Sequence, residues 1–197
     1  MRKFLTAILA ALTMIIFTGC GNSAEKPAEP KASAQVDAPA DKILVAYFSC
    51  TGNTKKAAEE VAALLDADTF EIVPAQAYTP DDLNYNVEDC RANVEQKDSA
   101  ARPEIKSKIE NIAQYKAIVV AFPIWWGAEP RIIDTFVESY DLAGKVIVPV
   151  CTSGGSDIQT AEKNLQELCK GADVRSGKRL GITSTDEVKA WLDSLKL

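Results

Sequence analysis

A hydroxyl- and amide-rich segment, residues 49–54, holds the side chains best placed to do chemistry. It reads Ser-Cys-Thr-Gly-Asn-Thr and lies between the apolar run 43–48 and the helical pattern 55–65. A polar turn between a buried strand and a helix N-terminus directs backbone N–H groups, side-chain donors and the positive helix end at one point. We therefore expect this segment to bind an anion, in particular a phosphate group. It lacks the Gly-Lys-Ser/Thr of a triphosphate loop and the three spaced glycines of a dinucleotide fingerprint.

Two further polar or aromatic segments follow apolar runs. Residues 123–127, Pro-Ile-Trp-Trp-Gly, follow the run 117–122, and residues 151–156, Cys-Thr-Ser-Gly-Gly-Ser, follow the run 146–150. Taken singly, adjacent tryptophans are more often packing residues, and Ser-Gly-Gly-Ser is more often a flexible turn. Their shared position at strand ends is what indicates a function.

The elements that must position these segments alternate along the chain from residue 42 onward. Short β-branched runs predict strands at 43–48, 69–73, 117–122, 145–151 and 174–181, the last being the weakest because Arg175, Gly177, Lys178 and Arg179 interrupt it. Apolar residues at helical spacing predict helices at 55–65, 104–113, 131–140, 158–169 and 185–195. This order predicts an α/β fold, a doubly wound five-stranded parallel sheet in the order 2-1-3-4-5 with helices on both faces. The loops after strands one, three and four would then meet at the crevice where strand order reverses, which is where such folds bind ligands.

The three segments together resemble the bacterial flavodoxin-like family, whose phosphate loop reads Ser/Thr-x-Thr-Gly-x-Thr. The resemblance covers residues 42–197 and implies a flavodoxin-like electron-transfer protein that binds FMN non-covalently. By this resemblance, the phosphate would be held by Ser49, Thr51, Gly52, Asn53 and Thr54, with Cys50 in the same loop. The flavin ring would be lined by Pro123, Ile124, Trp125, Trp126 and Gly127. Its far side would be closed by Thr152, Ser153, Gly154 and Gly155.

The loop after the fourth strand carries no aromatic residue, whereas many electron-carrier flavodoxins place aromatics on both faces of the ring. We therefore expect one ring face to be open, with room for a hydride donor or a quinone, as in the related flavin quinone reductases. An FMN-dependent quinone or azo-type reductase is thus an alternative to the carrier. A lipoprotein that binds flavin or another phosphorylated ligand without turnover is a further alternative.

The composition excludes several classes of function. The chain has no histidine, which rules out a Ser-His-Asp triad, a Cys-His dyad and a histidine-ligated metal. Its net charge of −6 argues against nucleic acid and anionic lipid as partners. It suits a basic protein partner instead.

The N-terminal residues resemble a bacterial lipoprotein signal. Arg2 and Lys3 precede the apolar stretch 4–17, and Thr-Gly-Cys follows at 18–20. This pattern predicts a signal peptide at 1–19, a lipidated Cys20 that begins a disordered tether at 20–41, and a folded domain at 42–197. An uncleaved anchor is disfavoured, because the apolar stretch falls short of the roughly 20 residues that a bilayer span needs. We expect an exported, membrane-anchored protein. Since nicotinamide cofactors are not expected outside the cytoplasm, it would exchange electrons with a redox protein or membrane quinones.

Residues 74–103 are too many for an ordinary connection between two elements. They either cover the site or form a surface excursion with a short helix near 87–95. Arg91 lies within this stretch, and we expect a solvated side chain there in place of a ligand contact.

Four cysteines lie beyond Cys20, and the sequence leaves their pairing open: Cys50, Cys90, Cys151 and Cys169. A disulfide between Cys50 and Cys151 is not expected, because the third strand separates the strands that they follow. Cys50 also sits where the Cys-x5-Arg loop of small tyrosine phosphatases begins. Position 56 is a lysine, which lacks the planar guanidinium clamp of that loop.

Overall fold

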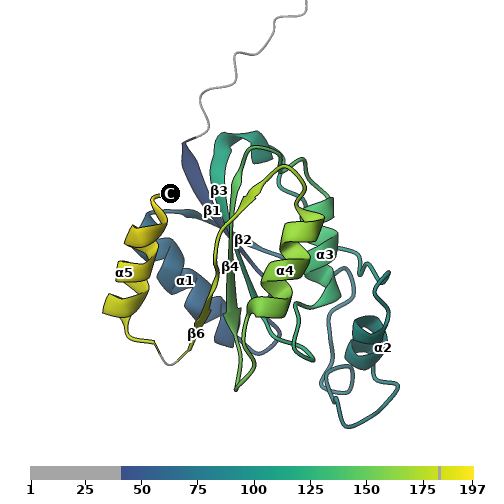
Figure 1. Ribbon diagram of the computed structural model, residues 1–197. Coiled ribbons are helices and arrows are strands. Elements are labelled where there is room, and N and C mark those ends of the chain that lie inside the picture. The colour runs from purple at the N-terminus through teal and green to yellow at the C-terminus, as the bar shows by residue number, and fades with distance from the viewer. Residues whose placement is uncertain (1–40, 182) are drawn as a thin grey trace, which may run out of the picture. The chain divides into compact units, whose positions relative to one another are not determined.

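The computed structural model describes residues 41–181 and 183–197. The expected signal peptide, Cys20 and most of the expected tether lie outside the described residues. Parallel pairing joins the strands in the order β2-β1-β3-β4-β5, and β6 also pairs with β4 (Figure 1). The predicted fold class and strand order are confirmed. The strands are β1 Lys42–Tyr47, β2 Asp68–Glu71, β3 Tyr115–Pro123, β4 Val146–Thr152, β5 Asp173–Val174 and β6 Lys178–Leu180.

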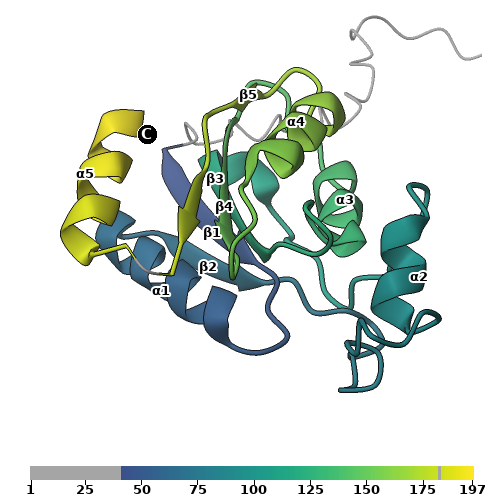
Figure 2. The same ribbon diagram turned by 60° about the horizontal axis from the view of Figure 1, so that its bottom comes forward.

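Helices cover both faces of this sheet (Figure 2). The helices α1 Asn53–Leu65 and α5 Thr185–Leu195 pack on one face, and α3 Arg131–Glu138 and α4 Gln159–Leu168 pack on the other. Alternation along β1 explains the two layers, since Leu44 and Ala46 belong to the core under α3 and α4, while Val45 and Tyr47 belong to the core under α1 and α5. Residues 117–122 of β3 are all buried, as expected for a central parallel strand.

The fifth strand position is divided in two. β5 pairs with the start of β4, β6 pairs with its end, and residues 175–177 interrupt the ladder between them. The interruption lies beside Pro149, in the middle of β4. A Cβ on Gly177 would come 2.5 Å from the Pro149 carbonyl oxygen, so only glycine fits there. The sequence predicted that residues 175–179 interrupt this strand. The structure confines the interruption to residues 175–177, because Lys178 and Arg179 lie within β6.

The helix predicted at 104–113 is wrong. Ile105 forms an antiparallel bridge with Pro74, and the Lys106 N–H donates to the Val73 carbonyl at 2.8 Å. The backbone is therefore extended here, and the only regular element in this stretch is the 3-10 turn η1 Ile112–Gln114. Ile105, Ile109 and Ile112 lie in this irregular segment, and all three are partly buried against the core. Their spacing along the sequence is that of a helix, although the backbone is not helical.

The segment 74–103 forms an excursion between β2 and β3, and it carries the short helix α2 Arg91–Lys97. In Figure 1 this helix lies apart from the sheet, on the side of α3. The predicted short helix at 87–95 is confirmed in kind, with its start four residues later. No helix of residues 41–181 and 183–197 has the length and apolar character to cross a membrane.

Candidate functional site

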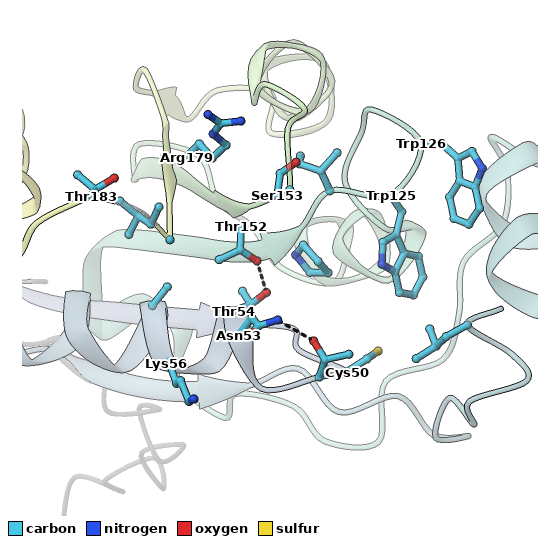
Figure 3. Close-up of a pocket in the computed structure, with 18 of the residues that line it drawn as sticks. Cys50, Asn53, Thr54, Lys56, Trp125, Trp126, Thr152, Ser153, Arg179 and Thr183 are labelled. Carbon is cyan, nitrogen blue, oxygen red and sulfur yellow. Dashed lines mark hydrogen bonds between the residues drawn. The ribbon is translucent and has the colours of Figure 1, made fainter. Parts of the chain in front are cut away.

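A cavity of about 970 Å³ lies at the carboxyl edge of the sheet. The loops after β1, β3 and β4, the first turns of α1, the connection from β6 to α5, and the excursion all contribute to its wall. Figure 3 shows Trp125 and Trp126 together at one end of it, Arg179 and Thr183 toward the other, and Thr54 beside Thr152 near its centre. The place of the cavity is the one that the strand order predicted.

The loop at 49–54 is shaped by Gly52, which has φ +85° and forms the N-cap of α1. The Gly52 N–H donates to the Ser49 Oγ at 3.1 Å, and the Asn53 side-chain amide donates to the Thr51 Oγ at 3.3 Å. No described side chain caps the helix N-terminus, in contrast to α5, where Ser184 and Glu187 form a capping box. The first N–H groups of α1 therefore lack side-chain partners and are available to an anion.

The loop at 49–54 is tied to the end of β4 by one hydroxyl pair. Thr54 is buried, and its Oγ lies 2.8 Å from the Oγ of Thr152. This bond spans 98 residues of sequence and crosses over β3, which separates β1 from β4 in the sheet. It fixes the distance between the two loops that flank the cavity.

The tryptophan loop is a tight turn at residues 125–128. The Trp125 N–H donates to the Ala128 carbonyl at 2.9 Å, and the Ala128 N–H donates back to Trp125 at 3.1 Å. Trp126 and Gly127 have φ values of +48° and +81°, the combination of a type I′ turn. A tryptophan in this left-handed conformation costs on the order of 1 kcal/mol, and such strain is typical of functional sites.

The two indoles have different surroundings. Trp125 meets Phe48 and Tyr78 edge to face, with ring centroids 5.6 and 5.3 Å away, and is therefore part of an aromatic cluster against the core. Trp126 stands half exposed at the tip of the turn, where its only described aromatic partner is Tyr85, at 6.4 Å. Trp125 therefore forms a packed part of the cavity wall, and Trp126 forms an exposed part of it.

Eleven of the predicted site residues line the cavity: Cys50, Thr51, Asn53, Thr54, Pro123, Ile124, Trp125, Trp126, Thr152, Ser153 and Gly154. The other four, Ser49, Gly52, Gly127 and Gly155, belong to the same loops without lining it. Ser49 and Gly52 shape the loop at 49–54 through their mutual hydrogen bond. In the loop after β4, the Ser153 Oγ accepts from the N–H groups of Gly155 and Ser156, at 3.1 and 2.8 Å.

The comparison with family models decides the family. A model described as flavodoxin matches residues 42–195. The chain belongs to the flavodoxin family. No curated protein shows a significant match to it.

Solved structures of flavoproteins resemble this flavodoxin-family domain. A protein from Bacteroides eggerthii that is assigned as a flavoprotein is 44% identical, with a TM-score of 0.76, over 79% of this chain and 98% of its own. A second, from Bacteroides uniformis, is 46% identical, with a TM-score of 0.74, over 77% of this chain and 97% of its own. A flavoprotein from Lactobacillus acidophilus NCFM, solved in complex with FMN, is 25% identical, with a TM-score of 0.61, over 77% and 98%.

Sequence reasoning missed part of the cavity wall of this flavodoxin-family domain. The excursion supplies Leu83, Tyr85 and Ala92, so one of the two interpretations left open for it, that it covers the site, holds at this wall. The only signal for it was the unusual length of the segment. Lys56, Glu60, Arg179 and Thr183 also line the cavity, and no motif marked them.

Arg91 braces the excursion and does not line the cavity. Its guanidinium lies 4.0 Å from the centroid of the Tyr78 ring, and its Nε donates to Glu95 at 2.6 Å. The Tyr78 hydroxyl donates to the same carboxylate. The expectation of a solvated Arg91 is therefore corrected, because the side chain is largely buried in this network.

The thiol of Cys50 is not activated. Cys50 is exposed as a residue, yet desolvation of the sulfur raises its pKa to about 11, against the smaller opposing effect of Arg91. A phosphatase-like nucleophile would need the opposite shift. Cys50, Cys90, Cys151 and Cys169 all have free thiols.

A buried acidic group follows the tryptophan turn. Glu129 is fully buried and accepts two hydrogen bonds from the Asn164 amide, at 2.9 and 3.3 Å, while its backbone carbonyl accepts from Gln96 of α2 at 2.9 Å. Burial, together with the neighbouring carboxylate of Asp134, raises the pKa of Glu129 to about 7. Arg131 bonds that Asp134 at 3.1 Å. This network joins the segment after the turn to α2, α3 and α4.

Proposed function

We propose that this domain binds FMN non-covalently in the cavity and serves as an electron carrier. The observation that carries the proposal is the convergence of an uncapped helix N-terminus, two tryptophans and a glycine-containing loop on one cavity. The flavoprotein from L. acidophilus, which shares the fold, was solved in complex with FMN and supports this choice of ligand.

The residues present fit the parts of FMN. The free N–H groups at the start of α1, with the hydroxyls of Thr51 and Thr54, would hold the phosphate through neutral donors. Trp125 and Trp126 would offer the apolar wall for the tricyclic ring. Ser153 and Gly154 would present backbone groups to its polar edge. The volume of about 970 Å³ is ample for a ligand of this size.

A bound flavin supplies the redox chemistry, and the chain's own residues bind, orient and shield it. The Thr54–Thr152 pair holds the two flanking loops at a fixed spacing. Trp125 forms part of the cavity wall, and its edge-to-face contacts with Phe48 and Tyr78 hold it in place. The proposal assigns no acid-base chemistry to the titratable side chains of the wall, which are Cys50, Lys56, Glu60, Tyr85 and Arg179.

Absorption spectroscopy tests the function directly. The purified protein, mixed with FMN and separated from the excess, should keep a flavin spectrum that dithionite bleaches and air restores. Retention of no flavin would contradict the proposal. A carrier should exchange electrons quickly with a one-electron acceptor and slowly with NADH or NADPH, whereas rapid NAD(P)H oxidation coupled to a quinone would assign the domain to the reductases.

We also propose that the domain works outside the cytoplasm, anchored through lipid on Cys20, and exchanges electrons with a redox protein or membrane quinones. The Thr-Gly-Cys motif at 18–20 after an apolar stretch supports this. Cys20→Ser should move the protein from the membrane fraction to the soluble fraction while FMN binding stays unchanged. Continued retention in the membrane would indicate an uncleaved anchor.

A further inference from the structure

One end of the cavity has no part of FMN assigned to it. The phosphate, the ring and the polar edge of the ring occupy the loops after β1, β3 and β4, and the wall continues beyond them along α1, β6 and α5. We call this end the annex, and the residues that define it are Lys56, Ala57, Glu60, Arg179, Leu180 and Val188. The whole cavity, of about 970 Å³, lies at the upper end of the roughly 300–1,000 Å³ of ordinary ligand sites. It therefore has room for a second chemical group.

The floor of the annex is apolar and firmly packed. Ala57 from α1, Leu180 from β6 and Val188 from α5 are all buried, and they belong to one core cluster. The Thr185 hydroxyl donates to the Glu60 carboxylate at 2.7 Å, which ties the start of α5 to α1 beside this floor. A preformed apolar surface with a few polar groups around it is typical of a small-molecule site, and it suits the flat face of a nucleobase.

Two cationic side chains border the annex. Figure 3 shows Arg179 and Lys56 in the half of the view away from Trp125. Within residues 41–181 and 183–197, neither cation has a carboxylate at ion-pair distance. Arg179 donates to the Ser156 carbonyl at 3.4 Å, which is long for a hydrogen bond. The charges of both side chains are therefore available to an anion that lies beyond the loop at 49–54.

We propose that the annex binds a nucleoside 5′-phosphate group, with the phosphate near Lys56 and Arg179 and the base on the apolar floor. Glu60, which retains acceptor capacity beside its bond from Thr185, would accept from a ribose hydroxyl. Such a group has two sources. It is the adenylate half of FAD, whose other half is the FMN moiety, or it is a separate nucleotide such as AMP bound beside FMN. The proposal rests on the FMN binding proposed above and adds a subsite to it.

Titration calorimetry with FMN and with FAD tests the first source. If the adenylate half occupies the annex, the wild-type protein should bind FAD about tenfold more tightly than FMN. Arg179→Gln and Lys56→Gln each remove one charged donor, and each should lower the affinity for FAD about tenfold more than the affinity for FMN. Equal losses for the two flavins would overturn the proposal, because the two cations would then serve the phosphate of FMN.

Neighbouring cations provide matched controls. Lys55 precedes Lys56 on α1 and pairs with Glu71 at 3.9 Å, and Arg175 precedes β6 and pairs with Asp173 at 2.8 Å. Neither Lys55 nor Arg175 lines the cavity. Lys55→Gln and Arg175→Gln remove the same charges from the chain and should leave both flavin affinities within about twofold of the wild type. Control variants that discriminated against FAD as strongly as Arg179→Gln would overturn the proposal.

AMP added to the FMN-loaded protein tests the second source. AMP should bind with an affinity that Arg179→Gln lowers about tenfold, and inorganic phosphate should bind about tenfold more weakly than AMP because it lacks the base. Phosphate that bound as tightly as AMP would reduce the annex to an anion site and overturn the proposal.

The outcomes separate the annex from the FMN site. Tighter binding of FAD supports the adenylate half of FAD as the occupant, and binding of AMP beside FMN supports a separate nucleotide. A protein that binds FMN, binds FAD no more tightly and does not bind AMP would overturn the annex alone. A protein that binds neither flavin would contradict the proposed FMN binding as well.

Discussion

The hydroxyls of Thr54 and Thr152 lie 2.8 Å apart, although their residues follow strands that are not neighbours in the sheet. The bond links the first turn of α1 to the end of β4, and Thr54 is buried beneath the loop that would hold the phosphate. The same hydroxyl that the sequence assigned to phosphate binding therefore also has a structural partner. The two roles can be separated by measurement.

Thr54→Val should weaken FMN binding roughly ten- to a hundredfold, since a hydrogen bond to a charged group contributes about 1.5–3 kcal/mol. Riboflavin, which lacks the phosphate, should bind with nearly unchanged affinity. Fluorescence titration gives both dissociation constants. Thr152→Val is the matched control, because it breaks the same hydroxyl pair from the other side. If both variants lose equal affinity for both ligands, Thr54 acts through the loop spacing and not through the phosphate.

The two tryptophans should respond differently to truncation. Trp125→Ala removes an indole packed between Phe48 and Tyr78, and we expect a loss of about 2–3 kcal/mol in the free energy of unfolding. Trp126→Ala removes an exposed ring held at positive φ and should leave stability within about 1 kcal/mol of the wild type. Urea denaturation measures both. Quenching of tryptophan fluorescence by FMN should persist in part in each single variant, and unchanged FMN affinity and quenching in the double variant would place the ring wall elsewhere.

The sequence predicted most of the sheet because its signal is local. The run 117–122 is buried throughout, and the segment 49–54 opens a helix, so periodicity and turn chemistry sufficed for both. The failures have non-local causes. Ile105, Ile109 and Ile112 have helical spacing, yet the backbone at 104–106 pairs with residues 73–75, a partner that no sequence window around them contains. The division of the fifth strand depends on Pro149 lying beside Gly177.

The site follows the same rule. Loops that begin at strand ends could be predicted, since the strand order brings those ends together. The place of Tyr85 on the cavity wall could not be predicted, because it depends on the fold of the excursion, in which the Asn93 side chain bonds the Tyr85 carbonyl. Nor does the sequence show that Trp125 and Trp126, although adjacent, lie in different environments, since this depends on the positive φ of Trp126.

Three glycines allow steric and backbone effects to be distinguished. Gly177→Ala places a Cβ 2.5 Å from the Pro149 carbonyl oxygen and 2.7 Å from the Ile158 side chain, and should cost about 2–3 kcal/mol. Gly52→Ala meets nothing within 4 Å but must keep φ at +85°, and should cost about 1 kcal/mol. Gly154→Ala has neither problem and should be nearly neutral. Thermal unfolding measures the melting temperature of each variant. Equal shifts in the three variants would contradict both the steric and the backbone explanation.

The buried carboxyl of Glu129 should make stability decrease as the pH rises. Burial first, and then Asp134, raise its pKa from the ordinary 4.5 to about 7. Between these two values the folded protein holds a proton that the unfolded chain has released, so the free energy of unfolding decreases over this window. The small pocket beside it is also lined by Asp134 and Arg131 from α3, Asn164 and Glu167 from α4 and Arg102 from the excursion, and burial also raises the pKa of Asp134.

Glu129→Gln keeps the shape and an acceptor for Asn164 but carries no charge at any pH. Its melting temperature should therefore exceed that of the wild type at pH 8 by more than it does at pH 5, as measured by calorimetry. Glu138→Gln is the control, because the hydrogen bond from Arg102 lowers the pKa of Glu138 from the ordinary 4.5, so the effect of this variant should not change between pH 5 and pH 8. The stability that Glu138 contributes is present above its ordinary pKa and is lost as the pH falls through the lowered value. If Glu129→Gln lowered the melting temperature by the same amount at pH 5 and pH 8, Glu129 would hold the same protonation state throughout, and the buried network would have no part in the pH dependence.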